Sequence, residues 1–342
     1  MEAAATQCLF KPKDYASDQE VKWCPGCGDY AIINAVQKAF SELNLKKEKV
    51  AIISGIGCSS RFPYYMDTYG FHTIHGRPAA VATGVKLANP ELSVWMISGD
   101  GDSLAIGGNH FIHAVRRNIN INLILFNNEI YGLTKGQYSP TSERGKITKS
   151  SPFGTVESPF SVGELVLGAQ GQFYARVPDT DVKLMTQVII EAEKHQGLSL
   201  VEVLQNCVIF NDKTHAEITN KENKANNQLI LEHGKPMLFG ENNNKGIRLN
   251  GLELEVVTIG ENGITESDIL VHDATTKSNV LHNMLIQMKL PEFPIAMGVI
   301  RNTEASVFDK EFTSQITNQQ ETSKFKSLDD LFLSGNTFTI KD

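Results

Sequence analysis

The stretch SGDGDSLAIGGNHFIHAVRRNININLILFNNEIYGLTKGQ, residues 98–137, decides the fold. Residues 94–98 form a short apolar run that ends in a Gly-rich turn, and residues 121–126 form a second one that ends in paired asparagines. Short apolar runs of this kind are typical of buried parallel strands. Residues 104–117 have apolar side chains at helical spacing. The stretch therefore predicts a strand–helix–strand unit of a parallel α/β sheet.

Asp100 and Asn128 follow the two predicted strands, at the edge where open parallel sheets bind ligands. Carboxylate and amide oxygens suit Mg²⁺, which also binds phosphate. Either motif alone, GDG or NN, consists of ordinary turn residues. Because the two stand one crossover apart, they indicate a magnesium and phosphate site. The alternative is a common strand–helix–strand unit with turn residues at its strand ends.

The composition is that of an ordinary globular protein, with 41% hydrophobic and 21% charged residues in a chain of 342. This length allows one large α/β domain or two smaller ones. The net charge of −7 argues against a nucleic-acid-binding surface. The sequence has no apolar span long enough to cross a bilayer, and residues 1–20 lack the order of a signal peptide. We expect a cytoplasmic protein.

Five cysteines in a cytosolic chain of this size are not expected to form a disulfide framework. Metal binding or catalysis is expected instead. They are Cys8, Cys24, Cys27, Cys58 and Cys207. The CPGC loop at residues 24–27 could hold a metal or act as a redox dithiol at a helix start. A redox dithiol of the thioredoxin kind normally follows a strand, and no predicted strand precedes this loop. A zinc site would need a second close pair of cysteines, and the other cysteines are scattered singly. Scattered thiolates that converge on one cluster fit a [4Fe–4S] centre, which takes four cysteines.

Two further loops carry chemistry-bearing residues next to predicted strand or helix ends. The loop SGIGCSSR, residues 54–61, follows a predicted strand, and its glycines let the backbone approach a ligand. This loop places Cys58 near Asp100, whereas an isolated cysteine is more often a buried small apolar residue. His75, Gly76 and Arg77 precede a predicted helix, a natural place for an anion. The alternative for this tripeptide is a solvated loop.

Taken together and in order, five motifs resemble the β subunit of 2-oxoacid:ferredoxin oxidoreductases. They are WCPGCG, SGIGCSSR, HGR, GDGD and NNEIYGLTKGQ. The resemblance covers about residues 21–211, and beyond them only the general C-terminal shape is similar. The segment CSSRFPYYMDTYGFHTIHGR, residues 58–77, is most similar to the 2-oxoglutarate branch, also called 2-oxoglutarate synthase.

The resemblance implies a parallel-sheet α/β fold of the thiamine-diphosphate-binding kind, with a C-terminal extension. Residues 1–211 would hold the cofactors, and residues 212–342 would form a partly loop-rich extension. The implied Mg²⁺ ligands are Asp100, Asn128 and the backbone oxygen of Ile130. Those implied for the [4Fe–4S] cluster are Cys24, Cys27, Cys58 and Cys207, which leaves Cys8 unligated.

The resemblance also assigns residues to thiamine diphosphate and to the substrate. Those around the cofactor would be Ile56, Gly57, Cys58, Ser59, His75, Gly99, Asp100, Gly101, Asp102, Asn128, Ile130, Gly132, Leu133 and Thr134. Arg61 and His75 would be the catalytic residues. Arg61 could pair with either carboxylate of a 2-oxoacid substrate.

The activity that the resemblance implies is oxidative decarboxylation of a 2-oxoacid, with CoA, to acyl-CoA and CO₂, with electrons passed to ferredoxin. Thiamine enzymes need a glutamate from a second α/β domain, and the sequence shows no such domain. An α subunit would therefore supply it, most simply in an (αβ)₂ assembly. Alternatives are a pyruvate or broad-specificity enzyme, a cluster-free thiamine decarboxylase or synthase subunit, and a non-enzymatic zinc-binding or electron-transfer module.

The remaining segments carry weaker signals. Residues 139–158 predict a surface loop rather than a lid over the cofactor. Residues 161–204 predict a helix, a strand, a second helix and a final strand that complete the parallel sheet. Residues 214–250 predict long loops, with His215 as a surface histidine without a role. Residues 269–301 predict a strand with an exposed end at residues 271–273, a helix, and a second strand.

Overall fold

The computed structural model describes residues 9–340, and its core is one sheet with strand order β2-β1-β3-β4-β6-β5-β11-β7. Its strands are β1 (Val50–Ser54), β2 (Tyr69–His72), β3 (Ser93–Gly99), β4 (Asn122–Asn127), β5 (Phe173–Pro178), β6 (Ser199–Leu204), β7 (Gln228–Leu231) and β11 (Ile295–Asn302). All neighbouring strands are parallel except β5 and β11. The predicted α/β fold with a mostly parallel sheet is thus confirmed.

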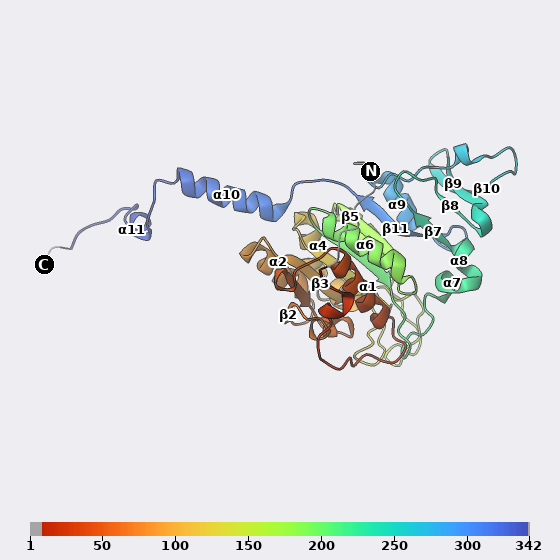
Figure 1. Ribbon diagram of the computed structural model, residues 1–342, viewed down its shortest axis with the longest axis horizontal. Coiled ribbons are helices and arrows are strands. Elements are labelled where there is room, and N and C mark those ends of the chain that lie inside the picture. The colour runs from red at the N-terminus through yellow and green to blue at the C-terminus, as the bar shows by residue number, and fades with distance from the viewer. Residues whose placement is uncertain (1–8, 341–342) are drawn as a thin grey trace.

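Helices cover both faces of this sheet, as Figure 1 shows. The helices are α1 (Asp29–Glu42), α2 (Pro78–Ala88), α3 (Asp100–Leu104), α4 (Gly108–Arg117), α5 (Val162–Gly168), α6 (Val182–Lys194), α7 (Ala216–Thr219), α8 (Lys221–Asn227), α9 (Val280–Gln287), α10 (Phe308–Thr322) and α11 (Leu328–Phe332). Because side chains alternate across a strand, Ile52 and Ile124 pack on α1 and α6, whereas Ile53 and Leu125 pack on α2 and α4. Every residue of β4 and β6 is buried, as their mostly apolar sequences predicted, and this includes Glu202 in β6.

The helix predicted over residues 104–117 is interrupted, and this prediction was wrong at its start. The structure has a short α3 directly after β3, then a break, and α4 begins at Gly108. This break requires a glycine at position 107, because a Cβ there would lie 2.4 Å from the backbone oxygen of Asp102. A Cβ on Gly76 would lie 2.4 Å from the backbone nitrogen of Gly107. These two glycines therefore allow the loop of residues 75–77 to lie directly against the break between α3 and α4.

Residues 214–250 are not long loops, so that prediction was wrong as well. They contain α7, α8, β7, β8 (Leu238–Phe239) and β9 (Lys245–Asn250), and the last two form a small antiparallel sheet with β10 (Glu253–Thr258), which follows. β7 pairs in parallel with β11. Its Leu229 and Leu231 pack in the core, although the sequence around them is polar. The sheet therefore continues across Asn211, and the predicted strand at residues 269–272 is only an isolated bridge at Val271.

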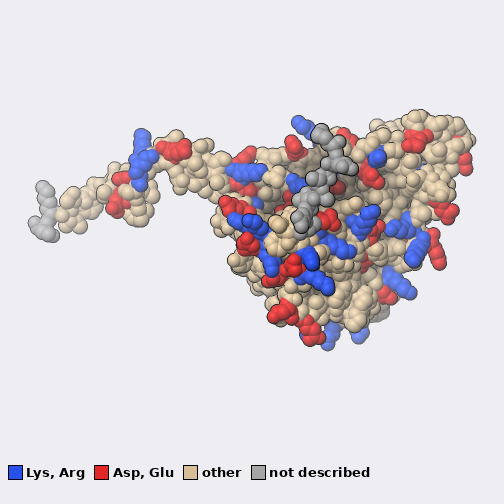
Figure 2. Space-filling model, in the orientation of Figure 1, with Lys and Arg blue, Asp and Glu red and all other residues tan. Residues whose placement is uncertain are grey.

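The surface has two further features of note. Figure 2 shows acidic and basic side chains interspersed on the visible face, without a continuous basic patch there. α10 and α11 extend away from the sheet as an arm at the C-terminal end (Figure 1).

No helix within residues 9–340 combines the length and the apolar character needed to cross a membrane. Cys8, predicted to be unligated, lies outside the described residues.

Candidate functional site

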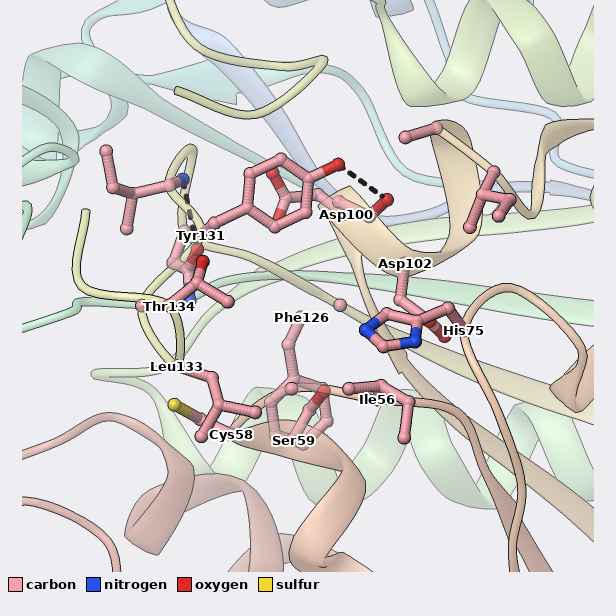
Figure 3. A pocket seen from close by; sticks show the side chains of 18 of the residues that line it. Ile56, Cys58, Ser59, His75, Asp100, Asp102, Phe126, Tyr131, Leu133 and Thr134 are labelled. Carbon is pink, nitrogen blue, oxygen red and sulfur yellow. Dashed lines mark hydrogen bonds between the residues drawn. The ribbon is translucent and has the colours of Figure 1, made fainter. Parts of the chain in front are cut away.

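A pocket opens where β1, β3 and β4 end, and Figure 3 shows the side chains that surround it. Every residue predicted to surround the cofactor lines this pocket, from the loop after β1 to the segment after β4. The pocket also has lining residues that the sequence did not indicate, among them Asp29, Ile106 and Tyr131. Tyr131 donates a hydrogen bond of 3.1 Å to the backbone oxygen of Gly101. The fold thus gathers segments far apart in the sequence around one hollow.

Asp100 begins α3 and is only 1% exposed. Its Oδ2 accepts a hydrogen bond of 2.6 Å from the Thr141 hydroxyl. Burial raises the pKa of Asp100, although the hydroxyls of Ser139 and Thr141 oppose that rise. Among the described residues, no basic side chain forms an ion pair with it. A buried carboxylate without a basic partner is the kind of group that a divalent cation stabilises.

The paired asparagines after β4 face different surroundings. Asn128 lines the pocket, and its Nδ2 donates to Gln205 Oε1 at 2.8 Å. Asn127 lies beneath, where its Nδ2 donates to Glu202 Oε1 at 2.7 Å. Glu202 is itself buried and paired with Arg176 at 2.9 Å. Asn127 therefore joins the pocket floor to a buried ion pair, whereas Asn128 presents its other atoms to the pocket.

Asp102 also lines the pocket, but its carboxylate is used to hold loops together. Oδ1 accepts from the backbone nitrogen of Gly76 at 2.7 Å, and Oδ2 accepts from the Ser98 hydroxyl at 2.7 Å. These bonds hold the segment of His75 against the pocket, where the His75 side chain is exposed (Figure 3). Asp102 thus positions the residues around it through both of its oxygens.

The cysteines at positions 24, 27, 58 and 207 gather at one side of the pocket, and all four are free thiols. A Cβ on Gly132 would lie 3.5 Å from Cys207 Sγ and 3.6 Å from Cys58 Sγ. Burial and the Asp29 carboxylate raise the pKa of Cys58 to about 12, with Cys207 and Cys24 adding to the rise. Burial and Asp29 likewise raise the pKa of Cys27, with Cys207 and Cys58 contributing.

These thiols are grouped too loosely to share one ion. Within residues 9–340, no three His, Cys, Asp or Glu side chains are arranged to hold a single metal ion. A [4Fe–4S] cluster instead accepts four thiolates, one on each iron, and so spans a wider group of cysteines. Cys27 and Cys58, whose pKa values are raised, would become thiolates on binding a strongly positive centre. The four-sulfur set fits such a cluster.

Arg61 lies outside the pocket, in an adjoining hollow that it lines together with Lys22, Tyr64 and His72. The two hollows share Ile56, Gly57 and Leu133 as walls. Arg61 therefore lines a hollow next to the pocket that holds Asp100, and these three residues lie between the two.

Comparison with known proteins identifies the family. The family model described as "Thiamine pyrophosphate enzyme, C-terminal TPP binding domain" matches residues 55–203. The chain is 48% identical to 2-oxoglutarate oxidoreductase subunit KorB of Mycobacterium tuberculosis, over 90% of this chain and 82% of that one. The chain belongs to the family of 2-oxoacid:ferredoxin oxidoreductase β subunits. The resemblance seen in the sequence is confirmed.

Two further comparisons show how far the similarity extends. The β subunit of 2-oxoacid:ferredoxin oxidoreductase 1 of Aeropyrum pernix is 44% identical over 59% of this chain and 64% of that one. A solved structure of 2-oxoglutarate:ferredoxin oxidoreductase from Magnetococcus marinus, with 2-oxoglutarate, coenzyme A and succinyl-CoA bound, superposes with a TM-score of 0.75. It is 31% identical, over 96% of this chain and 97% of that chain. As a member of this family, the chain is part of a thiamine-diphosphate-dependent oxidoreductase.

The segment of residues 139–158 is not merely a surface loop, contrary to the prediction. Ser139, Thr141 and Ser142 are buried, and Thr141 Oγ1 lies 2.9 Å from Asn127 Oδ1 as well as contacting Asp100. Serine and threonine are favoured in loops for their local hydrogen bonds, so their composition alone does not reveal this contact. The short run SPTS at residues 139–142, close behind the predicted pocket segment, is the only sequence signal.

Two histidines were also placed wrongly. His215 is buried rather than a surface histidine, and its Nε2 lies 3.0 Å from the backbone oxygen of Asn127. His272 is fully buried rather than at an exposed strand end, and its Nε2 lies 2.9 Å from the backbone oxygen of Val299. In both cases a distant strand supplies the partner, which a local sequence pattern does not show.

Proposed function

We propose that this β subunit serves an enzyme that oxidatively decarboxylates 2-oxoglutarate with CoA and passes the electrons to ferredoxin. The observation that carries the proposal is the pocket that joins Asp100 and Asn128 to a group of four cysteines. The relative from Mycobacterium tuberculosis is named for 2-oxoglutarate. The similar structure from Magnetococcus marinus holds 2-oxoglutarate, coenzyme A and succinyl-CoA. Both support 2-oxoglutarate over pyruvate.

Asp100, Asn128 and the backbone oxygen of Ile130 would hold Mg²⁺ and, through it, the diphosphate. Asp100 supplies a buried carboxylate, and Asn128 supplies an amide oxygen from the neighbouring strand end. When bound, thiamine diphosphate supplies the electron sink that decarboxylation of a 2-oxoacid needs. The protein residues bind and orient it, since Asp102 and Ser98 hold the loops that form the pocket wall.

The four cysteines would hold the [4Fe–4S] cluster, beside the pocket. Cys58 contributes to both parts, because it lines the pocket and lies next to Cys207 across Gly132. One-electron acceptors placed next to a thiamine site allow electrons to leave singly. This arrangement distinguishes the proposal from a cluster-free decarboxylase, which has no use for four converging thiols.

Arg61 would bind a carboxylate of the substrate from the adjoining hollow. A guanidinium can make two parallel hydrogen bonds to a carboxylate. Lys22 lines the same hollow but is paired with Glu20, so Arg61 carries the unpaired positive charge among the described residues that line it. His75, exposed at the pocket, would contact the cofactor or the substrate as the second catalytic residue.

An α subunit would complete the site by supplying the glutamate that thiamine enzymes use. Residues 9–340 contain one large parallel sheet, and no second one that could carry such a residue. Ile74, Ile106 and Leu133 are exposed apolar side chains near the pocket, as expected where a partner covers it. We extend the proposal to an (αβ)₂ assembly, with residues 1–211 holding the cofactors and residues 212–342 as an extension.

The test is an anaerobic assay of the β chain co-expressed with its α subunit. We expect reduction of a one-electron acceptor with 2-oxoglutarate and CoA, much less with pyruvate, and none with the β chain alone. Cys24→Ser and Cys207→Ser should abolish the visible absorption of the cluster. Activity of the isolated β chain, or unchanged absorption in both variants, would contradict the proposal.

A further inference from the structure

Gln205 lies directly after β6, between the proposed magnesium ligands and the proposed cluster ligands. Its side chain is 1% exposed. Its Oε1 accepts a hydrogen bond of 2.8 Å from Asn128 Nδ2. Its Nε2 donates to Cys27 Sγ at 3.3 Å. A single buried amide therefore contacts both parts of the site.

The backbone oxygen of Asn206 fixes the orientation of this amide. It lies 2.6 Å from Gln205 Nε2, and a carbonyl oxygen can only accept. With the amide rotated by half a turn, two oxygens would face each other at that distance. Nε2 must therefore face Asn206 and Cys27, and Oε1 must face Asn128. The backbone nitrogen of Gln205 donates to Asn127 at 2.9 Å, which holds the main chain in place.

The orientation of Gln205 in turn decides which atom Asn128 offers to the pocket. Because Asn128 Nδ2 is committed to Gln205, its Oδ1 points the other way. That oxygen accepts a hydrogen bond of 3.1 Å from the backbone nitrogen of Ile130 and keeps a second lone pair. A cation can be bound by that lone pair but not by an amide nitrogen. Gln205 thus holds Asn128 in the orientation that suits Mg²⁺.

The hydrogen bond from Gln205 to Cys27 acts on the proposed cluster rather than on the proposed magnesium site. A cysteine that binds an iron–sulfur cluster carries negative charge, and the reduced cluster carries more of it than the oxidised one. An N–H group that donates to this sulfur stabilises the reduced state and raises the reduction potential. Gln205 Nε2 is placed for that role.

We propose that Gln205 is a positioning residue that acts on both cofactors at once. Through Asn128 it aims an oxygen at the magnesium and diphosphate, and through Cys27 it raises the reduction potential of the cluster. This inference rests on the proposed function, because it needs both cofactors in this chain.

The test compares four forms of the co-expressed α and β subunits, purified anaerobically. These are the wild type, Gln205→Met, Gln205→Glu and the control Gln187→Met, which replaces an exposed glutamine on α6. Two measurements are made that do not depend on activity. The midpoint potential of the cluster is titrated by electron paramagnetic resonance, and the affinity for thiamine diphosphate with Mg²⁺ is measured by calorimetry.

Gln205→Met removes both contacts, so we expect a more negative potential and an affinity weakened about fivefold, the size of one hydrogen bond. Gln205→Glu keeps an acceptor for Asn128 but replaces the donor to Cys27 with a carboxyl oxygen, which must turn away from the backbone oxygen of Asn206. It should show a more negative potential and a smaller loss of affinity than Gln205→Met, and its potential decides the matter if the methionine variant does not assemble its cluster. Wild-type potentials in the Gln205 variants, or wild-type affinity in Gln205→Met, would overturn the inference. Absence of iron from the wild type and the control would instead overturn the proposed function.

Discussion

Thr141 donates a hydrogen bond of 2.6 Å to the buried carboxylate of Asp100, which lies 41 positions earlier in the chain. The same hydroxyl oxygen lies 2.9 Å from Asn127 Oδ1. Asn127 then donates to Glu202, which is paired with Arg176. A chain of polar contacts therefore runs from the pocket to the centre of the sheet.

Thr141→Val should weaken the binding of thiamine diphosphate with Mg²⁺. It removes the hydroxyl donor and leaves Asp100 Oδ2 buried without it, at a cost of about 1–3 kcal/mol in the free energy of unfolding. Thr141→Ser keeps a hydroxyl and should restore most of the affinity. Calorimetric titration and urea unfolding measure both effects, with Thr148→Val in the same loop as control. Equal affinity in Thr141→Val and the wild type would show that this contact does not support Asp100.

Arg176→Met should destabilise the protein severely. The substitution leaves the Glu202 carboxylate buried and unpaired, which typically costs about 3–5 kcal/mol. Burial acts to raise the pKa of Glu202, but Arg176 and the hydrogen bonds around it lower the pKa overall. Urea unfolding of the single variant and of Arg176→Met/Glu202→Leu measures the effect. The double variant should recover much of the loss, and a single variant as stable as the wild type would rule out this account of the pair.

Two glycine substitutions should have opposite effects. Gly76 has a φ of 65°, and a Cβ there would meet the backbone of Gly107, so Gly76→Ala should destabilise the protein by more than about 1 kcal/mol. Gly84 lies in α2 with nothing near its Cβ position, so Gly84→Ala should stabilise it by roughly 0.5–1 kcal/mol. Thermal unfolding of the two variants checks the signs. Equal shifts would mean that the contact between Gly76 and Gly107 is unimportant.

Stability should decrease as the pH falls below about 6.5, partly through His282. Burial lowers the pKa of His282 from its ordinary 6.5, and Arg301 adds to the effect although other contacts oppose it. Its Nε2 contacts the backbone oxygen of Asp273 at 2.9 Å, and its Nδ1 lies 3.1 Å from Arg301 Nη1. The unfolded chain therefore takes up a proton near pH 6.5 that the folded chain does not, which favours unfolding at lower pH.

His282→Gln should make the decline between pH 7 and pH 5 shallower, because glutamine does not titrate. Urea unfolding at a series of pH values measures the slope. His110→Gln, at a partly exposed position on α4, is the control and should keep the wild-type slope. A wild-type slope in His282→Gln would assign the pH dependence to other groups.

The sequence predicted the sheet where its signals were strong and local. β3, β4 and β6 are mostly apolar, and turn residues mark the ends of β3 and β4, so both the strands and the positions of Asp100 and Asn128 could be predicted. β7 was missed because only Leu229 and Leu231 of its short run reach the core. The strand order at that edge depends on β11, which comes from a segment more than 60 residues later.

The candidate site was predictable as a set of residues but not as a network. Position and motif indicated which residues line the pocket, and they do line it. The supporting residues Thr141 and Gln205 could not be found in this way, since a threonine in a polar loop and a glutamine after a strand carry no chemical signal alone. Their roles follow from distances to Asp100, Asn128 and Cys27 that only the fold sets.

The central claim is that Asp100 holds a cofactor whose electrons pass to a cluster on the same chain. The most direct measurement is the electron paramagnetic resonance signal of the reduced cluster after 2-oxoglutarate and CoA are added anaerobically to the complex of α and β subunits. The account predicts this signal in the wild type and its absence in Asp100→Ala, with the cluster still present and reducible by dithionite. A substrate-induced signal of wild-type size in Asp100→Ala would contradict it.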